Sequence, residues 1–87
     1  MKTRDRYEVL PTPAAEVRAG ERAWRLTRNG DVMAHADTQA EVLGVGVKLA
    51  TLRWRLNDQP SELVIKGRDG RIRDSRTYGQ DPERIRG

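Results

Sequence analysis

Four cations lie within eight positions of the chain, and their type and spacing suit a site for anions: Lys66, Arg68, Arg71 and Arg73. They surround Asp69-Gly70, a pair that predicts a two-residue hairpin turn. In that register Arg68 faces Arg71 and Lys66 faces Arg73, so all four side chains share one face. Arginine holds phosphate or carboxylate through two parallel hydrogen bonds. The hairpin is therefore a candidate contact for nucleic acid.

The close spacing of these cations has two interpretations. Like charges directly opposite one another destabilise a hairpin, and a bound phosphate or an acidic partner would remove that repulsion. The other interpretation is a solvated basic face, neutralised by Asp69, Asp74 and salt screening. The overall charge does not decide between them, because 17 Lys and Arg residues are interleaved with 13 Asp and Glu residues for a net charge of +4.

Residues suited to catalysis or metal binding are scarce. The chain has no cysteine and one histidine, which excludes disulfides, thiolate zinc sites and clusters of histidine ligands. Asp69 and Asp74 lie at predicted turns, where Asp is favoured for backbone reasons. Gly44 and Gly46 lie inside a helical pattern rather than in a phosphate-binding loop. We therefore expect a protein that is not an enzyme and has no cofactor or metal.

A hairpin is predicted around Asn29-Gly30, because this pair favours the positive φ angles of a type I′ turn. Its strands are the alternating runs 22–28 and 31–36. The two-residue turn predicts that Leu26 lies opposite Met33 and that Trp24 lies opposite His35. The other predicted extended segments are 7–10, 61–67 and 72–74, and residues 11–21, with two prolines and a glycine, are predicted to be a loop.

A long helix is predicted from Gln39 to about Leu56, with Thr38 and Glu41 as a capping box. Its apolar residues form two stripes. One stripe is Val42, Val45, Leu49, Leu52 and Leu56, and the other is Leu43, Val47, Ala50 and Trp54. One stripe suffices to cover a small sheet. The second predicts either a sheet that curls widely around the helix or a homodimer interface formed by Leu43, Val47, Ala50 and Trp54.

These elements predict an α+β fold: an antiparallel sheet of four to five short strands with one long helix packed on one face, in the order β-ββ-α-ββ. We divide the chain into a flexible basic arm (1–6), a single domain (7–79) and a polar tail (80–87). No apolar run approaches the roughly 18 residues of a membrane span, and no apolar segment follows the charged residues 1–6 as in a signal peptide. We expect a small cytoplasmic domain without membrane contact.

The segment 62–74, Glu-Leu-Val-Ile-Lys-Gly-Arg-Asp-Gly-Arg-Ile-Arg-Asp, with Tyr78-Gly79 and Asp81-Pro82 after it, resembles the signature of the DUF2188 family of bacterial and phage domains of unknown function. Further matches lie at 9–11, Trp24, Gly30 and 37–41. This chain departs from the family pattern in a longer loop at 11–21, in Lys66 where relatives commonly have histidine, and in Gly44 and Gly46 within the helix. The resemblance implies a compact α+β domain and transfers no activity.

Two functions remain open at this stage. The first is a small binding module that contacts nucleic acid through Lys66, Arg68, Arg71 and Arg73. Three strands followed by a capped helix also resemble the N-terminal arm-binding domains of phage-type integrases, at the level of fold alone. The second is a phage or bacterial accessory domain that dimerises through the helix and docks on a host protein.

Overall fold

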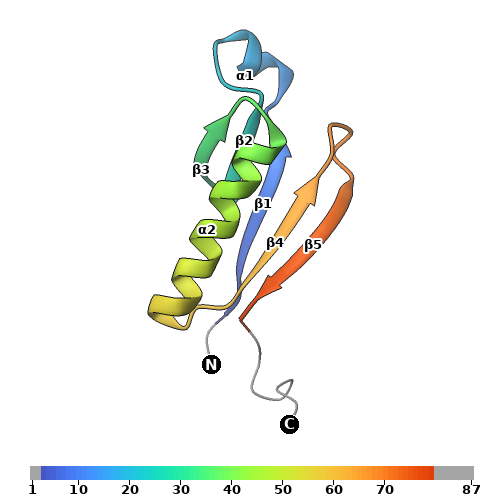
Figure 1. The fold of residues 1–87 in the computed structure, drawn as a ribbon. Coiled ribbons are helices and arrows are strands. Elements are labelled where there is room, and N and C mark those ends of the chain that lie inside the picture. The colour runs from blue at the N-terminus through green and yellow to red at the C-terminus, as the bar shows by residue number, and fades with distance from the viewer. Residues whose placement is uncertain (1–2, 80–87) are drawn as a thin grey trace.

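The computed structural model of the chain describes residues 3–79 and shows a five-stranded sheet with one long helix across one face (Figure 1). The sheet order is β3-β2-β1-β4-β5, which confirms the predicted α+β fold. The elements are β1 (Asp5–Pro11), α1 (Ala14–Arg18), β2 (Trp24–Arg28), β3 (Asp31–Ala36), α2 (Gln39–Asn57), β4 (Ser61–Lys66) and β5 (Ile72–Tyr78). None of the described helices is long and apolar enough to cross a membrane.

The sheet is mostly antiparallel, and its one parallel pair is β1 with β4. Strand β2 is antiparallel to β1 and β3 is antiparallel to β2, so β3 runs in the same direction as β1. Helix α2 then carries the chain back along the sheet, so β4 starts in the direction of β1 and joins its free edge (Figure 1). A helical crossover of this kind is the usual connection between parallel strands.

The first hairpin turns at Asn29-Gly30 as predicted, with φ angles of 52° and 93° and with Arg28 opposite Asp31. The register beyond the turn differs from the prediction. A β-bulge between Leu26 and Thr27 shifts the pairing, so Leu26 lies opposite Ala34 rather than Met33, and Trp24 lies opposite Ala36 rather than His35. The bulge places two small alanines on the face that packs against α2.

Helix α2 begins at the predicted cap. The Thr38 hydroxyl accepts a hydrogen bond from the amide of Glu41 at 3.2 Å and donates one to the Glu41 carboxylate at 3.0 Å. In a capping box the carboxylate accepts from the amide of the capping residue, whereas here the Glu41 carboxylate accepts from the Thr38 hydroxyl. The helix ends at Asn57, and Asp58 caps it in the left-handed conformation at φ 53°, which turns the chain toward β4.

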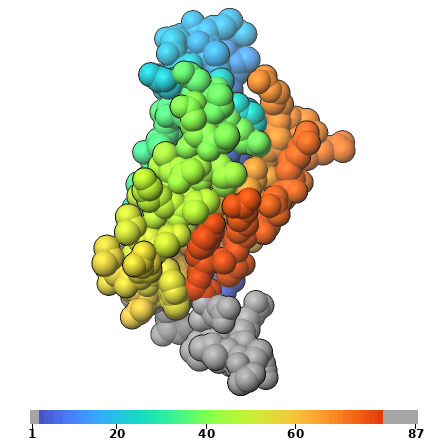
Figure 2. Space-filling model, in the orientation of Figure 1, coloured from blue at the N-terminus to red at the C-terminus, as the bar shows by residue number. Residues whose placement is uncertain are grey.

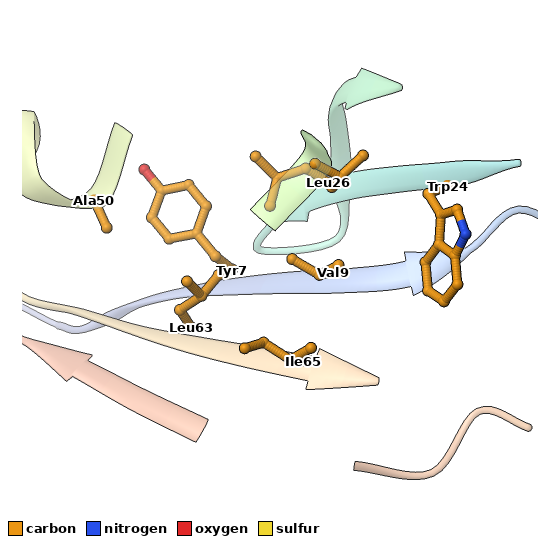
Figure 3. Packing of buried hydrophobic residues seen from close by; sticks show 8 residues of the cluster. Tyr7, Val9, Trp24, Leu26, Ala50, Leu63 and Ile65 are labelled. Atoms are coloured by element: carbon orange, nitrogen blue, oxygen red, sulfur yellow. The ribbon is translucent and has the colours of Figure 1, made fainter. Parts of the chain in front are cut away.

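The core lies between the sheet and α2 (Figure 3). Tyr7 and Val9 of β1, the central strand, have no exposed surface, and their neighbours Leu26 and Leu63 are equally enclosed. Figure 3 shows the Tyr7 ring directed toward Ala50 of the helix, while Trp24 closes the opposite end of the cluster. The complete cluster is Tyr7, Val9, Trp24, Leu26, Val42, Ala50, Leu63 and Ile65.

The ends of the predicted domain need one correction. Strand β1 begins at Asp5 rather than at residue 7, so the predicted arm of residues 1–6 is wrong for Asp5 and Arg6. Asp5 is nearly buried, and its carboxylate accepts hydrogen bonds from Arg53 Nε at 2.9 Å and from Asn29 Nδ2 at 3.2 Å. The predicted tail, 80–87, lies outside the described residues. The predicted loop at 11–21 contains the short helix α1.

Candidate nucleic-acid interface

The turn between β4 and β5 is wider than the predicted two residues. The amide of Gly67 donates to the carbonyl of Arg71 at 2.9 Å, and the amide of Gly70 donates to the carbonyl of Gly67 at 3.0 Å. The Asp69 carboxylate accepts from the amide of Arg71 at 3.0 Å, as Asp does in many turns. Gly70 has a φ of 80°, which favours glycine there. The loop is therefore braced by its own backbone.

The wider turn changes which face each cation occupies. A bulge between Ile65 and Lys66 places Lys66 opposite Ile72, so the predicted pairing of Lys66 with Arg73 is wrong. Lys66 lies on the sheet face away from α2, where its Nζ is 3.4 Å from Glu8 Oε2. The Arg73 guanidinium instead packs directly over Gly67, at a position that a Cβ on Gly67 would occupy. The four cations thus do not share one face.

Three of the four predicted cations remain as an exposed cluster: Arg68, Arg71 and Arg73. Within residues 3–79, none of these three guanidinium groups forms an ion pair. Most other cations of the described chain do, with partners that include Glu8, Asp37 and Asp5. Figure 2 shows the β4–β5 hairpin standing out from the rest of the surface. Unpaired positive charge is therefore concentrated on a protruding loop.

A cleft of about 580 Å³ opens between α1 and this hairpin. Two arginines, Arg18 of α1 and Arg68 of the loop, line it together with a mostly apolar wall. The wall consists of Pro11, Thr12, Pro13, Ala14, Val17, Ala23 and Trp24. The Thr12 hydroxyl is buried and has no hydrogen-bond partner in the described part of the chain. The cleft therefore offers apolar surface and two cationic side chains.

A second hollow of about 320 Å³ adjoins the same residues. It shares Trp24 and Arg68 with the first cleft and adds Gln39, Ile65, Gly67 and Arg73. The Gln39 side chain is held in place, because its amide donates to the carbonyl of Lys66 at 2.9 Å. Arg68 thus lines both hollows. Arg18, Arg68 and Arg73, none of which forms an ion pair within residues 3–79, line these hollows together with Trp24.

Sequence reasoning missed Arg18 and α1. A signal for α1 exists, since Pro13 precedes it, Glu16 lies in its first turn and Arg18 in its last, a charge order that suits the helix dipole. No signal links Arg18 to Arg68, because they are distant in sequence and line the same cleft only through the fold.

The open face of the sheet, away from α2, is charge-balanced rather than basic. Arg6 lies 3.1 Å from both Glu8 and Glu62, and Lys66 also pairs with Glu8. At the β2 side of this face, Arg25 pairs with Glu16. Ion pairs of this kind leave little charge for a polyanion, so we place the candidate site at the hairpin and cleft.

The predicted dimerisation surface faces the sheet, and its assignment to Leu43, Val47, Ala50 and Trp54 is wrong. Ala50 has no exposed surface, and Leu43 and Val47 pack against the core cluster. The ring of Trp54 lies against Gly79 after β5. The physical reason is Gly46, which lets this side of the helix approach the sheet closely. The exposed apolar residues of α2 are instead Val45, Leu52 and Leu56 of the other stripe.

Metal-ligating side chains do not gather anywhere in residues 3–79: no group of three His, Cys, Asp or Glu residues is placed to hold an ion. The one histidine, His35, lies opposite Arg25 on the open face, with its Nε2 3.2 Å from Glu21. The predicted partnership of His35 with Trp24 therefore does not occur.

The chain was compared with known protein families, curated proteins and solved structures. A family described as "Uncharacterized protein conserved in bacteria (DUF2188)" matches residues 7–78, which include the hairpin, the cleft and the helix. Neither the curated proteins nor the solved structures gave a significant match.

Proposed function

The chain belongs to the bacterial family DUF2188, whose description assigns no activity, and we propose from its geometry that it binds the phosphate backbone of nucleic acids. The contact residues are Arg68 and Arg71 of the β4–β5 loop and Arg73 at the start of β5, joined by Arg18 across the cleft. The observation that carries this proposal is that these guanidinium groups are exposed and unpaired, whereas most other cations among residues 3–79 have a carboxylate partner.

The physical argument starts from the repulsion among these arginines. Guanidinium groups held on one loop repel one another, and phosphates placed between them convert that repulsion into charge-assisted hydrogen bonds. The loop backbone is already ordered by its own hydrogen bonds, so little backbone entropy is lost on binding. Contacts of this type recognise the backbone rather than base sequence. We therefore expect weak sequence preference.

The cleft favours a single strand over a duplex. It has room for one unstacked base beside Trp24, with Arg18 and Arg68 at its side. In a duplex every base is stacked, and placing one in the cleft would require its extrusion, which costs a few kcal/mol. We therefore expect an oligonucleotide without secondary structure to bind more tightly than the corresponding duplex.

Fluorescence anisotropy of labelled oligonucleotides tests the proposal. If about three phosphates are neutralised, the logarithm of the affinity for a single strand falls with the logarithm of salt concentration at a slope of about −2. A fourfold increase in salt then weakens binding by about 20-fold. Binding that ignores salt, or no binding to single-stranded or duplex probes at low salt, would refute the proposal.

A matched pair of variants separates the site from the overall charge. Arg71→Glu and Lys48→Glu change the net charge equally, and both side chains are exposed without an ion pair in the described chain. We expect Arg71→Glu to lose most of the affinity and Lys48→Glu, on the outer side of α2, to lose little. Equal losses would mean that binding reflects net charge alone.

A second candidate function, contact with another protein, is favoured by the outer flank of α2. Leu56 is 75% exposed, and Val45 and Leu52 are 39% and 42% exposed, which is unusual for large apolar side chains on neighbouring helical turns. The two functions are compatible, because this flank and the hairpin are formed by different elements. Leu52→Asp would abolish the protein contact and leave oligonucleotide binding in place.

A further inference from the structure

The exposed apolar residues of α2 form a seam with the spacing of a coiled coil. Val45, Leu49, Leu52 and Leu56 follow one another at intervals of four, three and four residues, which are the intervals between successive core positions of a heptad. Leu49 is half-buried and the other three are exposed. A hollow of about 420 Å³ runs along the seam, lined by Glu41, Gly44, Val45, Lys48, Leu49 and Leu52.

The two borders of the seam differ in character. On one border lie Gly46, which is buried against the sheet, and Arg53, which pairs with Asp5 of β1. On the other border lie Glu41, Lys48 and Arg55, spaced seven residues apart and all exposed. The helix thus has one free charged edge, with an acid near its N-terminus, a base at its centre and a base near its C-terminus.

We propose that this flank of α2 binds a second copy of the chain, with the two helices antiparallel about a two-fold axis near Lys48 and Leu49. In an antiparallel pair the corresponding edges of the two helices meet. The axis brings Leu49 beside its own copy and Val45 beside Leu52 of the other chain. The seam is then buried against an identical seam.

Charge complementarity selects the antiparallel arrangement. Glu41 is the only carboxylate in α2, and the two-fold axis places it beside Arg55 of the other copy twice per dimer. In a parallel pair Arg55 meets no acidic residue of the partner helix, because Glu41 then lies two heptads away. Lys48 faces its own copy at the axis, so this one position opposes association. The inference does not depend on nucleic-acid binding.

Charge exchange tests the pairing, with association measured by sedimentation equilibrium over a range of protein concentrations. Glu41→Arg and Arg55→Glu each place like charges together and weaken the dimer, by about tenfold in Kd. The double variant restores opposite charges, and its Kd returns toward that of the parent chain. Far-UV circular dichroism checks helix content in each variant. A double variant as weak as the single ones would overturn the pairing.

Disulfide trapping tests the orientation, and the chain suits it because it has no cysteine. In the antiparallel dimer, position 49 lies beside its copy, while the two copies of position 56 are about 20 Å apart. Leu49→Cys therefore oxidises to a covalent dimer faster than Leu56→Cys does. Cross-linking of both variants at similar rates would indicate a parallel pair. Faster cross-linking at the more exposed position 56 would indicate random collision.

A substitution on another surface provides the control. Ile72→Asp alters a side chain that is 60% exposed but lies on β5, so the variant should dimerise like the parent chain. Leu52→Asp places a charge within the seam and should give a monomer with unchanged helix content. A parent chain that stays monomeric up to its solubility limit would overturn the inference, as would equal effects of the two Asp variants.

Discussion

Replacing Gly46 with alanine tests how closely α2 packs on the sheet, and Gly44→Ala is its matched control. Glycine in a helix is about 1 kcal/mol less favourable than alanine, so both variants gain that amount from the helix itself. The two sites differ in their surroundings. A Cβ on Gly44 would meet nothing within 4 Å, whereas one on Gly46 would lie 3.1 Å from Leu26 Cδ1 and 3.2 Å from Leu63 Cδ1.

The neighbours of Gly46 have little room to move, because Leu26 and Leu63 have no exposed surface. An added methyl group in a filled core costs about 1–3 kcal/mol, which cancels or exceeds the gain in helix propensity. We therefore expect Gly44→Ala to be stabilised by about 1 kcal/mol and Gly46→Ala to be unchanged or destabilised by up to about 2 kcal/mol.

Urea unfolding of the two variants and the parent chain, followed by circular dichroism at one fixed protein concentration, measures this difference. A 1 kcal/mol change in a domain of this size also shifts Tm by roughly 4–8 °C, so thermal unfolding gives a second reading. If Gly46→Ala were stabilised as much as Gly44→Ala, the helix would not be seated on Leu26 and Leu63 as described.

Three further predictions concern stability and are measured by the same urea titration. Asp5→Ala removes the hydrogen-bonded charge beside Arg53 and should cost about 2 kcal/mol; an unchanged midpoint would show that the pair is fully compensated by solvent. Thr38→Ala removes the cap of α2 and should cost about 1 kcal/mol, while Thr38→Ser retains most of that stability. Leu63→Ala opens a cavity in the core and should cost about 2–5 kcal/mol, whereas the exposed Leu56 should tolerate alanine within about 0.5 kcal/mol, a contrast that similar losses would contradict.

Local signals in the chain were sufficient for the long helix and for the order of the five strands, although they did not lead to α1. Asn29-Gly30 predicts its turn because few other pairs adopt two positive φ angles readily, and Thr38 predicts a helix start because its hydroxyl satisfies a free amide. Register was harder, because a β-bulge depends on what the strand packs against. The bulge at Leu26 places Ala34 and Ala36 under the helix and leaves Met33 39% exposed, and no local residue pattern predicts the bulge.

The sequence also did not decide which face of α2 packs on the sheet. Its two apolar stripes predict two candidate packing faces, and sequence alone does not rank them. Helix α2 packs on the sheet through Val42, Gly46 and Ala50. The stripe assigned to a dimer interface therefore faces the core, and of the other stripe only Val45, Leu52 and Leu56 are exposed. The packing face is decided by how closely the backbone at Gly46 fits against the Leu26 and Leu63 side chains. This fit exists only once the sheet is assembled.

Some features of the candidate site could be predicted from the sequence, and others depend on tertiary packing. The arginines near residues 66–73, the hairpin that carries them and the α+β class could be derived from residue types and short-range spacing, because turns and caps depend on a few neighbouring residues. The family was indicated by the resemblance of the segment 62–74 to its signature. The parallel pairing of β1 with β4, the separation of Lys66 from Arg73, and the meeting of Arg18 with Arg68 beside Trp24 were decided by tertiary packing. The first and the last of these features bring together residues far apart in the chain, and the separation of Lys66 from Arg73 depends on a bulge in the assembled sheet.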